Sequence, residues 1–249
     1  MFFLFSGEGP TDLGGCRKPS NFCRSEEFVV GPMAVIVDQI VFHRHRYSPL
    51  EAGICGYVPK RALIDRAMEL KSKKKSAHLP GAKTPKETGY FFQNARVLSR
   101  IALELQSQIG DEVVAVLFRD SDGVQSSNRG LWKDKFQSML NGFESERFFR
   151  GVPMIPKPKS EAWILYALKY DYQQCEFLEA RSGNDNSPKS LKAELVEHHG
   201  THLSIQSLVE LVRNRTIDIS RLDMPSFNAF RKELERVISP NEQITGFPF

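Results

Sequence analysis

Three carboxylates stand directly after two apolar segments of the sequence, and together they could hold a divalent metal ion. Glu8 follows the apolar run 1–6, and Asp120 and Asp122 follow the apolar run 112–118. In extended backbone, alternate side chains point the same way, so both aspartates can face one ion. Mg²⁺ prefers such oxygen ligands and can polarise a phosphoryl oxygen. The pattern therefore predicts a Mg²⁺ or Mn²⁺ site that acts on a phosphodiester, with all three carboxylates as catalytic residues and metal ligands.

The residues around these carboxylates also allow a plainer interpretation. Asp, Ser and Gly are turn formers, so the segment Asp120–Gly123 (DSDG) can be a turn and nothing more. Gly7 and Gly9 flank the first carboxylate, where they allow a tight turn and close approach of the backbone to a phosphate. Thr11 and Asp12 either shape the loop that follows or cap a helix.

Basic residues near the carboxylates are candidates for contact with a phosphate. Lys157 and Lys159 bracket Pro158 after the predicted strand 148–155. One of these catalytic candidates is expected to contact the scissile phosphate or to stabilise charge in the transition state, and a solvated basic loop is the alternative. Arg119 precedes the aspartate pair, where it either positions substrate or offsets the repulsion between carboxylates.

Two further basic segments are candidates for nucleic-acid binding. The first is the sequence HRHR, whose Arg44 and Arg46 lie at the end of a predicted helix. The second is a lysine run that contains Lys73, Lys74 and Lys75. Basic side chains bind a nucleic-acid backbone with release of its counterions. Each segment can instead be a solvated surface, because cations are favoured at helix C-termini and charge runs are usually exposed.

These side chains need a fold that brings the ends of distant strands together. Apolar runs, helical spacing and turn formers alternate along the chain, which indicates an α/β fold with a mainly parallel sheet flanked by helices. The predicted strands cover 1–6, 53–58, 112–118 and 148–155. The predicted helices cover 33–42, 61–70, 85–108, 131–142, a segment that begins at Ser160, and three short helices within 189–238. If the first and third strands are neighbours, their carboxylates meet at the edge of the sheet where ligands bind in such folds.

The composition is that of an ordinary globular protein. The chain has 249 residues, of which 41% are hydrophobic and 26% charged, so a wholly disordered chain is excluded. A net charge of +4 fits a nucleic-acid partner without requiring one. The N-terminal segment lacks the basic region of a signal peptide, and no segment reaches the roughly 18 apolar residues of a membrane span. We therefore expect a cytoplasmic protein with no membrane association.

The four cysteines show no CxxC spacing. Free thiols in a reducing compartment are therefore the expectation. Zinc bound by Cys16 and Cys23 together with histidines is the alternative.

The two carboxylate motifs resemble those of a known family. The segments Phe5–Asp12 (FSGEGPTD) and Leu117–Gly123 (LFRDSDG) resemble the signature motifs of the Toprim fold. Topoisomerases, bacterial primases and nucleases of the overcoming-lysogenization-defect type share this fold. Ile155–Leu165 (IPKPKSEAWIL) is similar to the small stand-alone Toprim-like proteins of bacterial phage-defence loci, which are often encoded beside an ABC or AAA ATPase. The resemblance implies a Toprim-like catalytic domain over 1–170, with a helical extension over 171–249 packed on it.

The resemblance also implies roles for individual residues. Glu8 is then the acid/base carboxylate and a metal ligand, and Asp120 and Asp122 are metal ligands. Glu161 is a further acidic ligand, as nuclease members of the fold commonly add one. The basic insertion 71–86 between the motifs departs from the family pattern and leaves the order of the strands open.

Two functions fit these observations. The first is a Mg²⁺-dependent nuclease that cleaves DNA or RNA as the effector of an antiviral defence system, under the control of a partner ATPase. The second is a latent or inactive interaction subunit of an ATPase complex. The absence of a GxxxxGK[ST] motif fits a protein without its own motor. A strand-passing or primer-synthesising enzyme is disfavoured, because no tyrosine has a recognisable catalytic setting and no template-binding module is evident.

Overall fold

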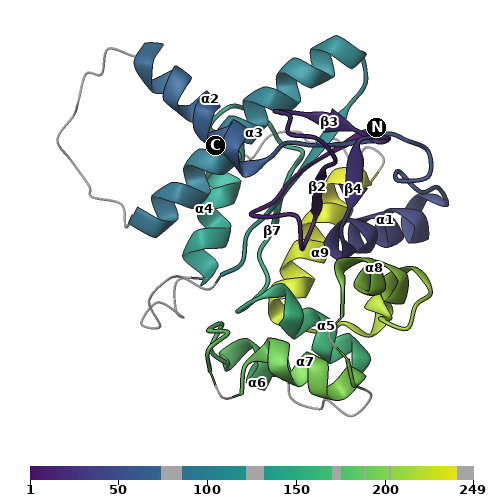
Figure 1. The fold of residues 1–249 in the computed structure, drawn as a ribbon. Coiled ribbons are helices and arrows are strands. Elements are labelled where there is room, and N and C mark those ends of the chain that lie inside the picture. Colours follow the sequence, from purple (N-terminus) through teal and green to yellow (C-terminus); the bar gives the residue numbers. More distant parts are fainter. Residues whose placement is uncertain (74–85, 122–131, 170–174, 188, 202, 240–249) are drawn as a thin grey trace.

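The computed structural model describes residues 1–73, 86–121, 132–169, 175–187, 189–201 and 203–239. In this part of the chain, the centre is a five-stranded sheet with the strand order β3-β5-β1-β6-β7 (Figure 1). Strands β5, β1, β6 and β7 are parallel, and β3 is antiparallel to β5 at one edge. The bounds are Phe2–Ser6 for β1, Cys23–Arg24 for β3, Cys55–Tyr57 for β5, Val113–Phe118 for β6 and Gly151–Met154 for β7. The predicted α/β class with a mainly parallel sheet is confirmed.

Helices cover both faces of the sheet. Leu4 of β1 and Ala115 of β6 belong to a core shared with α2, α3 and α4, whereas Phe5 and Val116 belong to a core shared with α1, α5 and α9. Figure 1 shows α2 and α4 to the left of the sheet, α3 running from the left toward the top of the view, and α1 to the right of the sheet. This double burial explains why the β1 and β6 sequences are almost wholly apolar. The helix bounds are Pro32–His45 (α1), Lys60–Lys73 (α2), Lys86–Ile109 (α3), Trp132–Glu144 (α4), Ser160–Leu168 (α5) and Pro225–Ile238 (α9).

Strands β1 and β6 are direct neighbours. They pair in parallel, with Phe5 opposite Val116 and Ser6 opposite Leu117. This pairing settles the strand order that the insertion between the two motifs left open. The loops that follow β1 and β6 therefore leave the sheet at the same edge.

A small antiparallel pair of strands follows β1, and no pattern in the sequence predicts it. It consists of β2 (Gly14–Cys16) and β4 (Phe28–Val30). Gly14 has φ +105°, and a Cβ on it would lie 2.0 Å from the carbonyl oxygen of Val29. Only glycine fits this position, because both the backbone conformation and the space exclude a side chain.

A disulfide bond joins Cys16 of β2 to Cys23 of β3. The expectation of free thiols is therefore wrong for these two cysteines, and so is the alternative of a zinc site that uses them. Cys55 is a free thiol and is buried in β5. Sequence spacing did not reveal the bond, because the turn between β2 and β3 is what brings the two sulfur atoms together.

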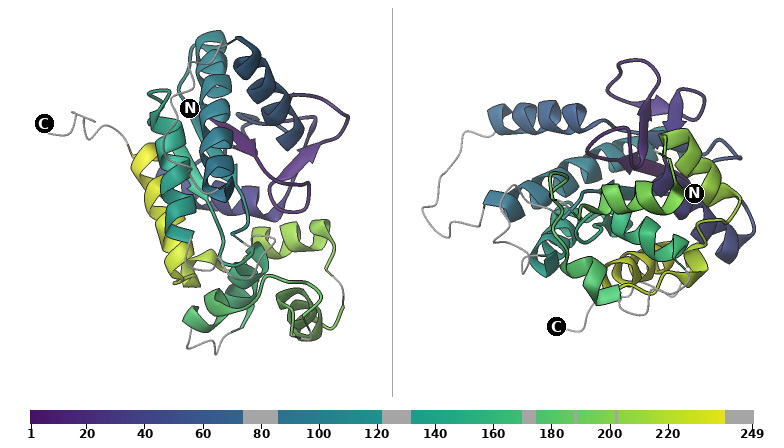
Figure 2. Two further views of the ribbon diagram at one scale, coloured as in Figure 1. Left: turned by 90° about the vertical axis from the view of Figure 1, so that its left-hand side faces the viewer. Right: turned by 60° about the horizontal axis from the view of Figure 1, so that its bottom comes forward.

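The C-terminal helices pack on the sheet. Trp163 of α5 stacks on Phe230 of α9 and meets Phe227 edge to face, and its Nε1 donates to the Ser226 hydroxyl at 2.8 Å. Trp163 is fully buried, so it belongs to the core. Figures 1 and 2 show the helices α6 and α7 at the opposite end of the molecule from α2. The predicted domain boundary at residue 170 stays a prediction. The remaining helices are α6 (Cys175–Ala180), α7 (Leu191–His199) and α8 (Ile205–Arg213).

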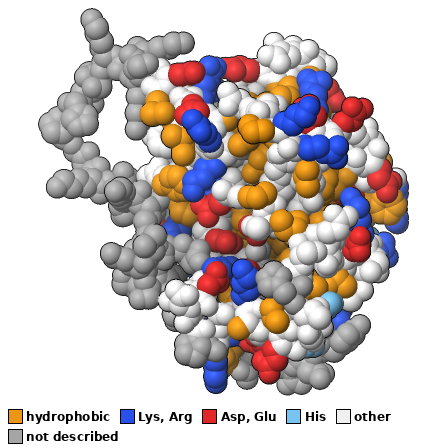
Figure 3. All heavy atoms as spheres, in the orientation of Figure 1, with side chains coloured by type: hydrophobic (Ala, Val, Ile, Leu, Met, Phe, Trp, Pro, Cys, Tyr) orange, Lys and Arg blue, Asp and Glu red, His pale blue; other side chains and the backbone are white. Residues whose placement is uncertain are grey.

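The described surface carries charges of both signs. On the face drawn in Figure 3, basic and acidic side chains alternate with hydrophobic ones over the described residues. Among the described helices, none combines the length and the apolar character that crossing a membrane requires.

Candidate functional site

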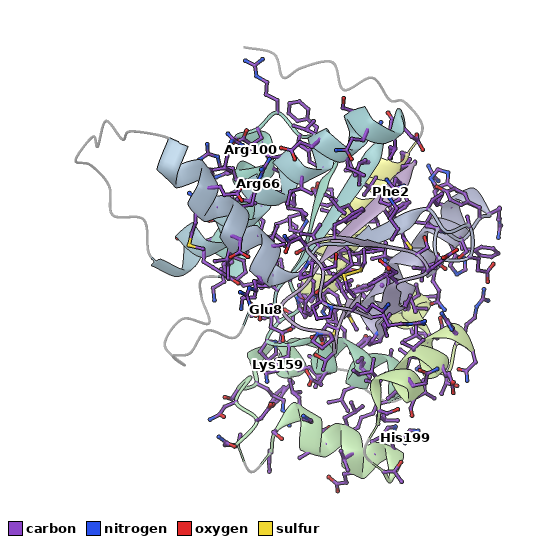
Figure 4. All side chains as sticks on the ribbon, turned by 45° about the horizontal axis from the view of Figure 1, so that its top comes forward. Phe2, Glu8, Arg66, Arg100, Lys159 and His199 are labelled. Atoms are coloured by element: carbon purple, nitrogen blue, oxygen red, sulfur yellow. A yellow bond between two sulfur atoms is a disulfide. The ribbon has the colours of Figure 1, made fainter. Side chains whose placement is uncertain are left out.

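Three loops meet at the carboxyl edge of the sheet. Glu8 lies just after β1, and Asp120 lies just after the neighbouring strand β6. The loop after β7 joins them, because the Ser121 backbone N–H donates to the carbonyl oxygens of Pro156 and Pro158 at 3.2 and 3.1 Å. Figure 4 shows Phe2 and Glu8 at opposite ends of the sheet, with Lys159 on the side of Glu8. The predicted meeting of the two carboxylate loops is confirmed.

Glu8 is exposed and lies between two cationic side chains. Its Oε1 is 3.8 Å from Nζ of Lys60, at the start of α2, and 3.8 Å from Nε of Arg119, which follows β6. Both cations lie beside the ring of Tyr90 in α3, at 5.6 and 5.8 Å from its centroid. Glu8 and Lys60 also line a cavity of about 900 Å³ together with Tyr57. Within the part of the chain that the structure describes, Glu8 is thus paired with the side chains of Lys60 and Arg119.

A second group of side chains, which we call the Ser160 cluster, comprises Asp12, Asp120, Ser160 and Glu161. The backbone N–H of Ser160 donates to Oδ1 of Asp120 at 3.2 Å, and its hydroxyl donates to Oδ1 of Asp12 at 2.6 Å. The same hydroxyl is 3.5 Å from Oε2 of Glu161. Asp120 thereby satisfies one of the N–H groups that the first turn of α5 leaves unpaired. All four residues line a cavity of about 500 Å³.

Burial changes the acidity of two carboxyls in the Ser160 cluster. It raises the pKa of Asp12, although hydrogen bonds from Ser160 and Thr11 and the charge of Lys159 act in the opposite direction. Burial also raises the pKa of Glu161, with Lys159 again opposing the shift and Asp12 adding to it. A bound cation would reverse both shifts, because an opposite charge favours the ionised carboxylate.

The donors of the Ser160 cluster suit a hard cation. All of them are carboxylate or hydroxyl oxygens, which Mg²⁺ and Mn²⁺ accept. Within the ranges that the structure describes, however, no three Asp, Glu, His or Cys side chains are arranged to hold a metal ion. Asp122 lies outside the described residues, so its role as a metal ligand stays a prediction. The donor chemistry therefore fits the metal, and the described ligand set is incomplete.

The two predicted lysines after β7 have different partners. Lys159 Nζ donates to Oδ1 of Asp185 at 2.8 Å, and Lys159 lines the same cavity as the Ser160 cluster. Lys157 Nζ is 3.9 Å from Oε2 of Glu179 in α6. Lys159 is therefore the better placed of the two to meet a phosphate in this cavity.

The predicted nucleic-acid contacts lie apart from these carboxylates. Arg44 and Arg46 are exposed in the last turn and at the C-cap of α1. Helix α1 starts at the carboxyl edge of the sheet, where the Met33 N–H donates to the Asp12 carbonyl oxygen. It ends near the opposite edge, because the chain that follows it leads into the start of β5. The two arginines are thus at the other end of the sheet, and their binding to nucleic acid stays a prediction. Of the lysine run, Lys73 ends α2, while Lys74 and Lys75 lie outside the described residues.

Two glycines flank Glu8 in the loop after β1. Neither Gly7 nor Gly9 has the left-handed backbone that would require glycine. A Cβ on Gly9 would meet no atom within 4 Å, whereas one on Gly7 would contact Leu13. The side chain of Asp12 caps no helix and instead bonds to Ser160 and Thr11. The chain bends at Glu8 and Gly9 and turns over residues 10–13, in a backbone conformation that does not itself require glycine at either position. The open space at Gly9 leaves room for a ligand.

Sequence reasoning missed three residues of this edge. Lys60 lies one position before the predicted helix 61–70, and the neighbouring residues in the sequence give no indication of a functional role. Tyr90 lies in a long helix whose apolar stripe indicates only a core. Ser160 was recognised as the start of a helix, but its contacts with two carboxylates depend on the docking of α5.

Comparison with known proteins adds no assignment. The chain matches no protein-family model, and searches of curated proteins and of solved structures yield no match. The Toprim resemblance therefore stays a prediction from the two motifs of the sequence.

Proposed function

We propose that this protein is a divalent-metal-dependent nuclease, Toprim-like in the arrangement of its two motifs, that cleaves phosphodiester bonds of DNA or RNA. The observation that carries the proposal is the position of Glu8 and Asp120 just after two adjacent parallel strands. Asp12 and Glu161 bring two more carboxylates to Asp120 through Ser160. Four acidic side chains from three separate segments of the sequence thus lie at one edge of the sheet.

The residues at this edge suit the steps of such a reaction. Mg²⁺ or Mn²⁺, when bound, would polarise a phosphoryl oxygen and neutralise developing charge. Asp120, Asp12 and Glu161 are the described candidates to hold the ion. Asp122, two positions further along the sequence, is the predicted ligand that lies outside the described residues. Glu8 is exposed, so its carboxylate can accept a proton from an attacking water. Lys159 presents a cation to a phosphate within the cavity of the Ser160 cluster.

The test is cleavage of plasmid DNA and of transfer RNA by the purified full chain, with and without Mg²⁺ or Mn²⁺. We expect cleavage only with metal, and a loss of about 100-fold or more in Glu8→Gln, as for the removal of a general base. Asp120→Asn should be similarly impaired. Glu210→Gln, which removes an exposed carboxylate of α8, is the matched control and should cleave normally. Identical behaviour of wild type and Glu8→Gln on every substrate would exclude the nuclease.

A latent interaction subunit is the second candidate. Two observations favour it: the described residues contain no set of three metal ligands, and Oε1 of Glu8 lies 3.8 Å from two cations. In this case calorimetric titration with Mn²⁺ should show no binding to the isolated chain.

An ATPase gene next to the gene for this chain would favour a regulated nuclease of an antiviral defence system.

A further inference from the structure

Arg119 is a buried cation with one unfilled hydrogen-bonding edge. The side chain is 0% exposed, and its Nη1 donates to the carbonyl oxygen of Phe118 at 2.6 Å. Its Nε and Nη2 have no hydrogen-bond partner within the part of the chain that the structure describes. These two nitrogens form one edge of the guanidinium, and an Arg side chain binds carboxylate or phosphate groups through two parallel N–H donors of this kind.

The Glu8 carboxylate does not fill this edge. Its Oε1 is 3.8 Å from Nε of Arg119, which is longer than a hydrogen bond. A buried charged donor without a partner is costly, so its presence in a folded protein requires an explanation. Because Glu8 is exposed and Arg119 is not, a ligand that displaces the carboxylate of Glu8 reaches the free edge of Arg119.

Tyr90 and Lys60 provide two further hydrogen-bond donors near the free edge of Arg119. The hydroxyl of Tyr90 is buried and, among the described residues, has no hydrogen-bond partner. The ring of Tyr90 lies beside both Arg119 and Lys60, and Nζ of Lys60 is as close to Glu8 as Arg119 is. The three side chains come from α2, α3 and the end of β6, so the fold as a whole builds the group. They offer donors and two positive charges to a ligand that supplies acceptors and negative charge.

We propose that Arg119, Lys60 and Tyr90 form an oxyanion site that binds a phosphate group of a nucleic-acid strand. The choice of nucleic acid rests on the proposed function, whereas the phosphate follows from the donors. The non-bridging oxygens accept from the Arg119 edge and the Tyr90 hydroxyl, and the ammonium of Lys60 balances the remaining charge. The cavity of about 900 Å³ that Lys60 lines has room for the adjoining nucleotide.

Glu8 competes for this site. Its negative charge lies 3.8 Å from both cations, so the phosphate must displace it. Removal of that charge in Glu8→Gln therefore strengthens phosphate binding. If Arg119 served only as the counter-ion of Glu8, the same variant would bind phosphate no better than wild type.

The experiment measures binding in EDTA, so that it does not depend on cleavage. The full chain is titrated into a fluorescently labelled single-stranded oligonucleotide, and inorganic phosphate is then added at constant ionic strength. We expect phosphate to displace the oligonucleotide. The variants Arg119→Lys, Tyr90→Phe and Lys60→Gln should bind about 10- to 100-fold more weakly, as for the loss of hydrogen bonds to a charged group. Lys232→Gln, at an exposed lysine of α9, is the charge-matched control and should bind like wild type.

Two results would overturn the oxyanion site. One is phosphate that does not displace the oligonucleotide from wild type. The other is an unchanged affinity for the oligonucleotide in variants that melt at the same temperature as wild type. If Arg119→Lys does not fold, the affinities of Tyr90→Phe and Lys60→Gln decide the question. If the protein binds the oligonucleotide but cleaves no substrate, the proposed nuclease is wrong and the oxyanion site stands. If it cleaves but the variants bind as wild type does, the oxyanion site is wrong and the nuclease stands.

Discussion

Nε of Arg119 lies 3.8 Å from Oε1 of Glu8, which brings the residue after β6 to the loop after β1 without a hydrogen bond between them. The cation is buried and the carboxylate is exposed. Such an arrangement contributes little to stability, because desolvation of the cation offsets the attraction. It is better explained by a ligand than by the fold.

The first prediction concerns the stability of Arg119→Met. Methionine fills a similar volume and needs no hydrogen bonds, so the free energy of unfolding should stay unchanged or rise by about 1 kcal/mol. Urea denaturation followed by circular dichroism measures it. A loss of more than about 3 kcal/mol would instead make Arg119 a structural residue.

The second prediction separates two roles of Asp120. Its carboxylate accepts the Ser160 N–H at the start of α5, so Asp120→Ala should lower the free energy of unfolding by about 1 kcal/mol, as for a lost helix cap. Asp120→Asn keeps a side-chain oxygen as acceptor and should unfold nearly like wild type. Equal destabilisation by both substitutions in denaturant titrations would argue against the capping role.

The third prediction is a pH dependence at Glu161. Burial raises the pKa of this carboxyl in the folded protein above its ordinary value. As the pH rises from that ordinary value to the raised one, the unfolded chain releases its proton first, and wild-type stability falls. Above this pH window, the free-energy cost of the buried ionised Glu161 carboxylate stays constant. The variant Glu161→Gln has no such carboxylate and therefore no such cost. The variant should therefore be more stable than wild type at pH 7, and the difference should shrink as the pH falls below the ordinary carboxyl pKa.

Metal ions provide the control for Glu161. A cation bound by the Ser160 cluster stabilises ionised carboxylates, so Mg²⁺ or Mn²⁺ should raise the melting temperature of wild type more than that of Glu161→Gln. Melting curves at pH 7 with and without metal show this. A difference between the two proteins that is independent of both pH and metal would contradict the assignment.

The fourth prediction concerns the bond between Cys16 and Cys23. The two residues are seven positions apart, so the bond closes a short loop, and its loss should lower the free energy of unfolding by about 2 to 3 kcal/mol. The double variant Cys16→Ser with Cys23→Ser, compared with wild type under a dithiol reductant, measures the effect. Cys55→Ala tests the buried thiol separately, and reductant should leave the contribution of Cys55 unchanged.

Much of the fold could be predicted from local patterns. The helix predicted over 33–42 and the one predicted to begin at Ser160 are present as α1 and α5, and all four predicted strands are present. The short strands β2, β3 and β4 could not be predicted, because two or three residues carry too little periodicity. Helix α6 was missed for a similar reason, since its six residues barely exceed one turn.

The sequence by itself determined the two carboxylate positions at the ends of β1 and β6. An apolar run that is buried on both faces has few other places in a domain, and the polar residues that follow it must leave the sheet. Only the tertiary structure decided which side chains meet there. The docking of α5 joins Asp12 and Glu161 to Asp120, and the approach of α2 and α3 sets Lys60 and Tyr90 beside Arg119 and Glu8. These contacts join residues far apart in the chain, so they depend on how helices pack on the sheet and leave no periodic trace in the sequence.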